Sequence, residues 1–373
     1  MSAHASPLGA ARPLAPGAAR PIRIAICDDS VVIRGALARM LAAEADFSVV
    51  ARVGDGAQAL ATIKTMKASA PVDVLILDIE MPVMDGMAAL PRLLEADPAL
   101  RVIMASTLTT RGAEIALRAL RLGAADYLPK PTTAMVADDS FRRELIAKIR
   151  GLVRLRNPAR ALGQAAPAGR EEASLAARPL APRKPSLLAI GSSTGGPQAL
   201  FTLIPALGKT LPVPVILTQH MPATFTPILA EHLGRLGGMP CAEARDGEVL
   251  RPGHIHLAPG DRHLLIRRDG ATLRARLSTD PPVNFCRPAV DPMLASAAEA
   301  CAGRVLVVML TGMGHDGREG TRAVVTAGGA AIAQDEATSV VWGMPGAIAQ
   351  AKLCHAILPL AQIAPKILEI VGR

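Results

Sequence analysis

Three side-chain types that together perform nucleophilic catalysis follow three separate apolar segments in the second half of the chain. They are Ser193, His220 and Asp316, which follow Leu187–Ile190, Val213–Thr218 and Val305–Leu310. A serine hydroxyl becomes a nucleophile when an imidazole takes its proton and a carboxylate orients the imidazole. If the segments are parallel strands, their carboxyl ends meet at one sheet edge. The pattern therefore predicts a hydrolase triad of these three residues.

Each member of this triad also has a simpler interpretation. Ser193 could cap a helix, His220 could be an ordinary histidine at a sheet edge, and Asp316 could belong to a turn. The turn Gly191–Gly196 could also hold a phosphate on helix amides. However, it matches neither nucleotide-binding glycine pattern and no lysine follows it. The shared position at strand ends favours the triad.

A second polar set follows the apolar segments of the first half. It consists of Asp28, Asp29, Asp78, Ser106 and Lys130. Three carboxylates in one crevice repel each other unless a cation joins them, and a hard divalent ion such as Mg²⁺ takes oxygen ligands. One carboxylate can then attack a phosphoryl group, whose charge the metal and an ammonium stabilise. The set predicts a phosphoacceptor site rather than separate helix caps.

Both halves alternate short apolar runs with amphipathic segments. Strand candidates in the first half are Ile22–Ile26, Ser48–Val53, Val72–Leu77, Arg101–Met104 and Asp126–Leu128. Helix candidates in the second half are Pro197–Leu207, Phe225–Leu236, Asp291–Cys301, Thr321–Ala327 and Gly346–Ala351. Such alternation is typical of parallel sheets covered by helices on both faces. We predict an α/β protein with two doubly wound parallel-sheet domains.

Composition changes mark the predicted boundaries. Residues 1–21 contain Ala, Pro and scattered Arg without the apolar core of a signal peptide, so we expect a disordered leader. Residues 151–185 are rich in Pro, Ala, Gly and Arg and are expected to form a linker. The predicted domains are 22–150 and 186–373. No apolar run reaches the length of a membrane span, and the five cysteines form no C-x-x-C pair, as suits a reducing cytoplasm.

The net charge of +9 raises the question of a nucleic-acid partner. The chain has one Trp and one Tyr and no basic run interleaved with aromatics, so we expect none. A transcription factor controlled by this phosphoacceptor site would need a helix-turn-helix tail, whereas the second half is rich in strands. His254, His256 and His263 could suggest a metal site, but no carboxylate or cysteine in the sequence pattern completes one.

The first half resembles response-regulator receiver domains over about residues 22–145. The resemblance is carried by the polar set above, by Pro131 after Lys130 and by the loop Met81–Gly86. It implies a flavodoxin-like fold in which a histidine kinase phosphorylates Asp78. It further implies that Asp28 or Asp29, Asp78 and the backbone carbonyl of Glu80 bind Mg²⁺. Ser106, Tyr127 and Lys130 would be the switch residues.

The second half resembles the CheB family, the protein-glutamate methylesterases of bacterial chemotaxis. The motifs are Gly191–Gly196, Thr218–Pro222, Leu257–Gly260, Pro281–Asn284, Arg287-Pro288, Leu310–Gly314, Asp316-Gly317 and Gly343–Pro345. The resemblance implies a Rossmann-like hydrolase with Ser193 as nucleophile, His220 as base and Asp316 as its orienter. Thr194 would flank the nucleophile, and the Met313 amide would donate to the oxyanion.

This resemblance also implies an activity and its control. The enzyme would hydrolyse glutamate γ-methyl esters, and deamidate glutamines, on methyl-accepting chemotaxis receptors, without a cofactor for the ester hydrolysis. A chemotaxis histidine kinase would be the phosphodonor, and a cytoplasmic enzyme would meet the membrane only through its receptors. Phosphorylation would shift a receiver that covers the cleft.

Two other functions stay open beside this one. The chain could be a degenerate hydrolase that only binds, or a hydrolase with a target outside chemotaxis. Phe285, Cys286, Ala289 and His315 depart from the residues expected of the family near the presumed cleft, which leaves substrate preference open.

Overall fold

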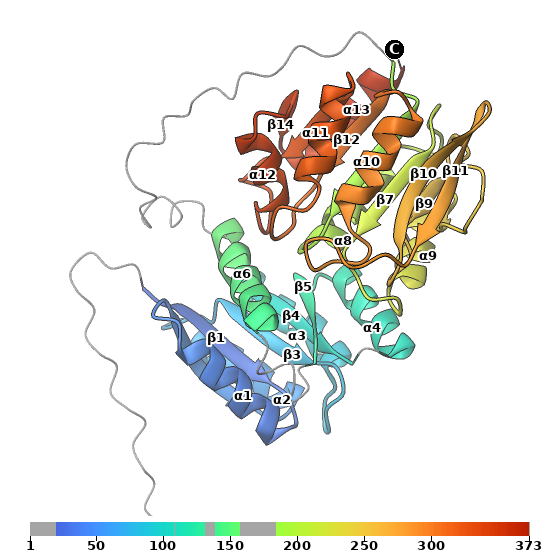
Figure 1. Cartoon of the computed structure of the whole chain (residues 1–373). Helices are drawn as coiled ribbons and strands as arrows, with labels where there is room; N and C mark the ends of the chain where they lie inside the picture. The colour runs from blue at the N-terminus through green and yellow to red at the C-terminus, as the bar shows by residue number, and fades with distance from the viewer. Residues whose placement is uncertain (1–19, 108, 131–138, 157–183, 373) are drawn as a thin grey trace, which may run out of the picture.

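The computed structural model describes residues 20–107, 109–130, 139–156 and 184–372. These residues build two parallel sheets with helices on both faces, one from each half of the chain (Figure 1). We call residues 20–156 the N-terminal unit and residues 184–372 the C-terminal unit. Within the described residues, no helix combines the length and apolarity that crossing a bilayer requires.

The N-terminal unit has a five-stranded sheet in the order β2-β1-β3-β4-β5. Its strands are β1 (Ile22–Cys27), β2 (Phe47–Val53), β3 (Val74–Asp78), β4 (Arg101–Ser106) and β5 (Asp126–Pro129). Its helices are α1 (Val31–Ala42), α2 (Gly56–Met66), α3 (Gly86–Ala96), α4 (Thr110–Arg121) and α6 (Asp139–Arg156). This strand order is that of the flavodoxin-like fold, and the central strand β3 is buried along its whole length.

The C-terminal unit has a seven-stranded parallel sheet in the order β14-β13-β12-β6-β7-β9-β8. Its strands are β6 (Leu187–Ser192), β7 (Val215–Gln219), β8 (Cys241–Glu243), β9 (Ile255–Leu257), β12 (Val305–Met309), β13 (Ala330–Gln334) and β14 (Ala356–Leu358). Its helices are α8 (Gly196–Ala206), α9 (Thr226–Gly237), α10 (Val290–Ala300), α11 (Arg318–Thr326), α12 (Met344–Gln350) and α13 (Leu360–Gly372). The predicted fold class of two doubly wound parallel sheets is confirmed.

The chain winds in opposite directions from the centre of this second sheet. From β6 it proceeds through β7 to one edge, and from β12 through β13 to the other. Open α/β sheets place their sites outside the strand ends at such a switch point. Both central strands are fully buried, since each packs against helices on both faces.

Two features differ from the expectation. An antiparallel hairpin, β10 (His263–Asp269) with β11 (Thr272–Ser278), was not predicted, because its strands carry exposed charged residues that mask the apolar alternation. Helix α6 continues through Arg156, past residue 150, because Leu152 and Val153 pack into the core. The expected leader and most of the expected linker lie outside the described residues.

The two units contact each other through α4 and β5 on one side. The ring of Tyr127 stacks on the ring of Phe225, with centroids 5.0 Å apart. Nearby, the Gln198 amide donates to the carbonyls of Leu120 and Ala124 at 2.7 and 2.6 Å. Because these groups are buried or half-buried, the contact continues the hydrophobic core from one unit into the other.

A second contact between the units involves α6. Gly151 packs so tightly that a Cβ there would lie 1.9 Å from the carbonyl oxygen of Val340. Arg154 pairs with Glu336 at 2.7 Å and donates to the carbonyl of Ser339 at 2.8 Å. A cavity of about 600 Å³ opens beside this contact, and Met313 and Trp342 line it together with residues of α6. Helix α6 therefore borders the loop that carries Met313.

Candidate active site

A tight turn after β6 presents Ser193. The turn closes through Gly195, whose φ of 74° favours glycine, and α8 begins at Gly196. A Cβ on Gly196 would lie 2.0 Å from the side-chain oxygen of Gln219, so only glycine fits there. Ser193 is half-buried, and its hydroxyl makes no hydrogen bond within the described part of the chain. The turn leaves this hydroxyl available for reaction.

Gln219 ties the ends of two neighbouring strands together. Its side-chain nitrogen donates to the backbone carbonyls of Ser193 and His220, at 3.0 Å each. Its side-chain oxygen accepts from the Ser192 hydroxyl at 2.7 Å. On the other side, the Ser193 N–H donates to the carbonyl of Thr311, after β12, at 3.0 Å. The three strand ends that carry the predicted triad therefore meet.

His220 and Asp316 form the hydrogen-bonded pair that a triad requires. The distance between His220 Nε2 and Asp316 Oδ2 is 2.7 Å, and Asp316 is buried. Further donors to this carboxylate are the N–H groups of Val290, Asp291 and Gly317, at 2.6, 3.1 and 2.9 Å. Because Ala289 gives α10 no side-chain cap, Asp316 caps this helix from another segment of the chain.

The pair shifts the pKa of both partners. Burial acts to raise the pKa of Asp316, but the hydrogen bond and charge of His220 and the donated N–H groups outweigh it and lower that pKa. Burial likewise acts to lower the pKa of His220, and its contacts with Asp316 and Cys286 outweigh it and raise that pKa. Asp316 therefore stays ionised and favours a proton on His220, as the orienter of a base must.

The second ring nitrogen of His220 faces a thiol. Cys286 Sγ lies 3.4 Å from His220 Nδ1, while Nε2 is taken by Asp316. Nδ1 is therefore the nitrogen left to accept a proton from a nucleophile. The structure gives no hydrogen bond between His220 and the Ser193 hydroxyl within the described residues, so the thiol occupies this nitrogen in the state that the structure shows.

The loop after β12 lies against the turn that carries Ser193. A Cβ on Gly312 would lie 2.9 Å from Ser193 Cβ, so the two backbones touch. The Thr311 hydroxyl donates to the carbonyl of the buried Thr194 at 2.9 Å and fixes the two loops together. Within the described residues, the Met313 N–H next to Gly312 has no carbonyl acceptor. It is available to a negative charge that develops beside Ser193.

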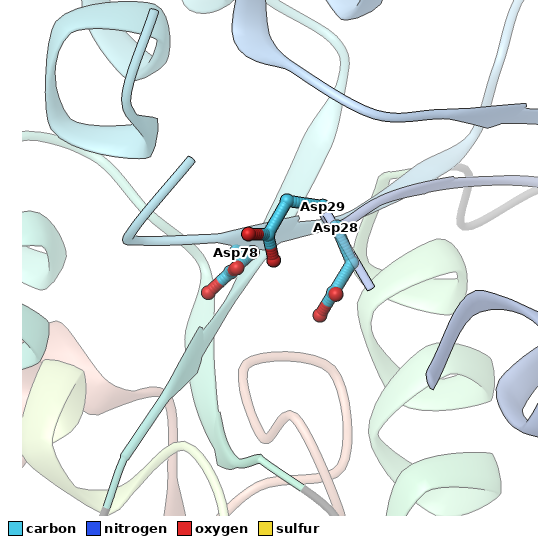
Figure 2. Close-up of side chains that lie close together, drawn as sticks. All are labelled: Asp28, Asp29 and Asp78. Carbon is cyan, nitrogen blue, oxygen red and sulfur yellow. The ribbon is translucent and has the colours of Figure 1, made fainter. Parts of the chain in front are cut away.

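The N-terminal unit gathers a second site at the carboxyl ends of β1 and β3. Carboxylate oxygens of Asp28, Asp29 and Asp78 lie within 4.8 Å of one another. Figure 2 shows these three side chains gathered at one place. Lys130 pairs with Asp78 Oδ2 at 2.7 Å. Burial, the largest effect, raises the pKa of Asp28 and raises that of Asp78 to about 6. The cluster holds more negative charge than Lys130 neutralises.

This donor set fits a hard divalent cation. All three candidate ligands are carboxylate oxygens, which Mg²⁺ prefers. Asp28 Oδ2 is buried and accepts no hydrogen bond within the described residues, although a buried carboxylate oxygen ordinarily has a partner. The N–H of Glu80 donates to Asp78 Oδ1 at 3.4 Å, which places the Glu80 backbone beside the cluster, while its carbonyl as a ligand stays a prediction.

The expected switch residues lie between this cluster and the other unit. The buried Ser106 hydroxyl donates to the carbonyl of Gly112 at 2.8 Å. Tyr127 is buried against Phe225, and burial raises the pKa of its phenol. Lys148 donates to the Tyr127 carbonyl at 2.8 Å. Tyr127 thus belongs to both the phosphoacceptor unit and the contact between the units.

Among the histidines that the structure describes, those singled out as possible metal ligands have other partners. His256 Nδ1 pairs with Glu248 at 2.6 Å, and His263 lies between the Pro281 carbonyl and the Ala289 N–H. Within the described residues, only the three aspartates of the N-terminal unit gather enough ligand atoms for a metal.

Comparison with known proteins identifies both units. The family model of the CheB methylesterase matches residues 188–367, and that of the response regulator receiver domain matches residues 24–138. "Protein-glutamate methylesterase/protein-glutamine glutaminase 1" of Paramagnetospirillum magneticum is 50% identical over 94% of this chain and 97% of its own. The chain belongs to the CheB methylesterase family.

Other CheB proteins agree in length and sequence. "Protein-glutamate methylesterase/protein-glutamine glutaminase" of Azospirillum brasilense is 48% identical over 98% of this chain and 97% of its own. Among solved structures, the Thermotoga maritima CheB methylesterase catalytic domain is 40% identical, covers 51% of this chain and 100% of its own, and has a TM-score of 0.49.

Sequence reasoning assigned no role to several residues that hold this CheB site together. Gln219 and Asn284 were part of the quoted motifs, and Asp291 was only the start of a helix candidate, yet each binds a triad member or its backbone. The sequence offered one indication of such residues: a polar side chain beside a strand end or helix start, at a position expected to be buried. A buried polar side chain needs a hydrogen-bond partner, but the sequence does not show which residue that partner is, because it depends on tertiary contacts.

Proposed function

We propose that this CheB protein is a phosphorylation-activated serine hydrolase. It demethylates glutamate γ-methyl esters, and deamidates glutamines, on methyl-accepting chemotaxis receptors. The names of its relatives, which state both activities, support the reaction. The observation that carries the proposal is the 2.7 Å bond between His220 and the buried Asp316, next to the turn that presents Ser193.

The proposed reaction uses Ser193, His220 and Asp316 in turn. Ser193 Oγ bonds to the ester carbonyl carbon while its proton passes to His220 Nδ1, and the charge of Asp316 stabilises the imidazolium. The Met313 N–H donates to the oxyanion of the tetrahedral intermediate. The C–O bond to the methoxy group breaks and methanol leaves with the His220 proton.

The second half of the reaction regenerates the enzyme. Water attacks the acyl carbon, His220 takes the water proton, and Ser193 leaves with a proton returned by His220. The product is a glutamate carboxylate. A glutamine follows the same route and releases ammonia. Thr194 flanks the nucleophile and fixes its turn.

Control is proposed to come from residues 22–150, the receiver, acting on residues 186–373 across a linker. A chemotaxis histidine kinase supplies the phosphoryl group that Asp78 accepts. Asp28 or Asp29, Asp78 and the Glu80 carbonyl would hold Mg²⁺, which when bound neutralises charge on the phosphoryl oxygens. Lys130 and Ser106 would contact the phosphoryl group.

The contacts between the units support a gating role for the receiver. Tyr127 packs on Phe225, and Gly151 packs on Val340, whose neighbour Val341 accepts from the Gly312 N–H at 3.0 Å. Movement of the receiver would therefore release the loop that carries Met313. A new dianionic group near Ser106 can bias such a two-state packing.

Methanol release from methylated receptor membranes tests the proposal. The wild type is expected to turn over and to be stimulated by a small-molecule phosphodonor with Mg²⁺. Ser193→Ala should abolish turnover, whereas the control Ser186→Ala, at the far end of β6, should not. Asp78→Asn should keep basal turnover and lose stimulation. Undiminished hydrolysis by Ser193→Ala would remove the assigned nucleophile.

The same assay separates the two other functions. A wild type that binds the receptor without releasing methanol would indicate a binding module. Hydrolysis of a simple ester without action on receptors would indicate a target outside chemotaxis.

A further inference from the structure

The turn Val283–Cys286, which no catalytic role yet includes, contacts the catalytic pair. Val283 and Cys286 exchange both backbone hydrogen bonds, at 3.1 and 2.9 Å. The two residues between them have positive φ values, 52° for Asn284 and 65° for Phe285. This is the geometry of a two-residue hairpin turn with a left-handed backbone. Asn tolerates that backbone, whereas a fully exposed Phe does so at a cost.

The Asn284 amide bridges two carboxylates. Its nitrogen donates to Asp316 Oδ1 and to Asp291 Oδ2, at 3.0 Å each. The other oxygen of Asp291 accepts from the Gly320 N–H at 2.7 Å. Burial and the charge of Asp316 raise the pKa of Asp291. Two carboxylates, one buried and one half-buried, therefore lie close together, and one amide nitrogen donates a hydrogen bond to each of them.

The same turn also reaches the base. Cys286 Sγ lies at His220 Nδ1, on the opposite side of the ring from Asp316. The turn thus contacts both ends of the His220–Asp316 pair. Because its backbone is fixed by the reciprocal hydrogen bonds, the amide and the thiol are held in one geometry.

We propose that Asn284 is a positioning residue of this hydrolase, whose amide keeps Asp291 and Asp316 ionised together so that Asp316 holds its full charge against His220. The inference rests on the proposed function and adds a residue to its site. Asn284 acts through Asp316 and touches neither nucleophile nor substrate.

Loss of the amide has a defined electrostatic consequence. Two neighbouring carboxylates without a bridging donor share one proton. Asp316 would then hold part of a negative charge, and the imidazolium of His220 would be less stable. The titratable groups that face this network are His220, Asp316, Asp291 and Cys286. The pKa of His220 should therefore fall. The rate at saturating substrate should fall as well, because the imidazolium that forms during the reaction is less stable.

Asn284→Gly isolates the amide from the turn, because glycine adopts a φ of 52° without strain. In full-length protein with a phosphodonor, we expect kcat to fall by about ten- to a hundred-fold with little change in KM, as for a lost hydrogen bond to a charged group. The acid limb of the pH–rate profile should move to lower pH by about one unit. The control Phe285→Gly, in the same turn, should have its acid limb at the same pH as the wild type.

A second substitution should rescue the first. In Asn284→Gly/Asp291→Asn the second carboxylate is gone, and the new amide can donate to Asp316 while its oxygen still accepts from Gly320. We expect kcat and the acid limb to return toward the wild-type values. A merely structural role for Asn284 predicts no rescue, so additive losses in this double-mutant cycle would overturn the proposal.

An NMR titration of the His220 ring separates this proposal from the proposed function, because it needs no substrate. The His220 pKa should be lower in Asn284→Gly than in the wild type and recover in the double variant. An unchanged His220 pKa in a folded Asn284→Gly protein refutes the positioning role even if the wild type hydrolyses receptor esters. If the wild type released no methanol but Asn284→Gly still had the lower His220 pKa, only the proposed function would be refuted.

Discussion

At the scale of single residues, Asp316 performs two tasks with one carboxylate. It forms a hydrogen bond with His220. It also accepts hydrogen bonds from N–H groups at the start of α10, a helix without a side-chain cap of its own. Charge-assisted bonds of this kind hold a carboxylate in one rotamer and favour its ionised form. The proposed orienter of the base is therefore also part of the fold's hydrogen-bond network.

The pKa shifts of this pair predict the pH dependence of hydrolysis. The base must be neutral, and Asp316 raises the pKa of His220 above its usual 6.5. Activity should therefore rise with pH as His220 loses its proton, and the midpoint of this acid limb should lie above pH 6.5. Asp316→Asn should lower kcat by about 10⁴-fold, as removal of a triad carboxylate does. The limb should also move to lower pH.

The pH profile of kcat/KM for both proteins checks this prediction. Asp269→Asn, an exposed carboxylate on β10 whose ion pair is with Arg274, is the matched control and should retain the wild-type profile. An acid limb at the same pH in wild type and Asp316→Asn would show that Asp316 does not set the pKa of the base.

At this scale the sequence could predict that the three candidate triad residues lie near one sheet edge, because residue types at strand ends are visible in a sequence, while their catalytic roles stay predictions. Ser193, His220 and Asp316 each follow an apolar run, and parallel strands end at one edge. The contact of Cys286 with Nδ1 could not be predicted, because it depends on how the turn Val283–Cys286 packs against His220, which is distant along the chain. The bridge from Asn284 to Asp291 was hidden for the same reason.

At the scale of elements, close approach between loops positions the site. The loop after β12 runs beside the turn after β6 because Gly312 has no side chain. The same glycine carbonyl accepts from the N–H groups of Gly343 and Met344, which attaches the start of α12. Three elements are thus anchored on one residue next to Met313.

Gly312→Ala tests this arrangement. The added Cβ would lie 2.4 Å from Met344 Sδ and 2.9 Å from Ser193 Cβ, so the loop must shift. We expect kcat to fall by about 10²-fold or more, as for a displaced oxyanion donor. Steady-state kinetics with methylated receptor provide the measurement.

The control for this substitution is Gly234→Ala in α9, where the nearest atom is 3.4 Å away and alanine favours the helix. This variant should retain wild-type kinetics. Full activity in Gly312→Ala would mean that the loop after β12 does not position the oxyanion.

The sequence predicts long buried elements better than short or half-exposed ones. The apolar β6 and β12 were recognisable, since both faces of a central parallel strand are buried. The hairpin β10–β11 was not, since exposed charged residues interrupt the apolar pattern of both strands. Likewise, α6 extends beyond the expected boundary because packing of Leu152 and Val153 outweighs the polar composition that follows.

At the scale of the whole molecule, the receiver and the hydrolase are tightly packed where they contact each other. The backbone of α6 at Gly151 touches the Val340 carbonyl directly. A core cluster also continues from Tyr127 to Phe225. The family resemblance implied that the receiver covers the cleft, but no sequence pattern predicts which residues make this contact, because it depends on the complementary shapes of two surfaces that are distant along the chain.

Gly151→Ala should weaken this docking. Its Cβ would meet the Val340 carbonyl at 1.9 Å, while alanine stabilises α6 itself. We expect basal hydrolysis without phosphodonor to rise several-fold and the stimulation by phosphodonor to shrink. Methanol release with and without phosphodonor measures both.

The matched control is Gly35→Ala in α1, whose nearest neighbour is the flexible end of Arg39 at 3.5 Å. It should leave basal activity and stimulation unchanged. If Gly151→Ala has the low basal rate and full stimulation of the wild type, the α6 contact does not restrain the enzyme.

The scarcity of aromatic residues gives the molecule an intrinsic optical signal at this contact. Trp342 is the chain's single tryptophan, it lines the cavity beside α6, and its ring N–H donates to the Gln334 carbonyl at 2.9 Å. Departure of the receiver would hydrate one face of this indole, whose emission then shifts to longer wavelength. Undocking can therefore be followed in real time by tryptophan fluorescence in the unlabelled protein.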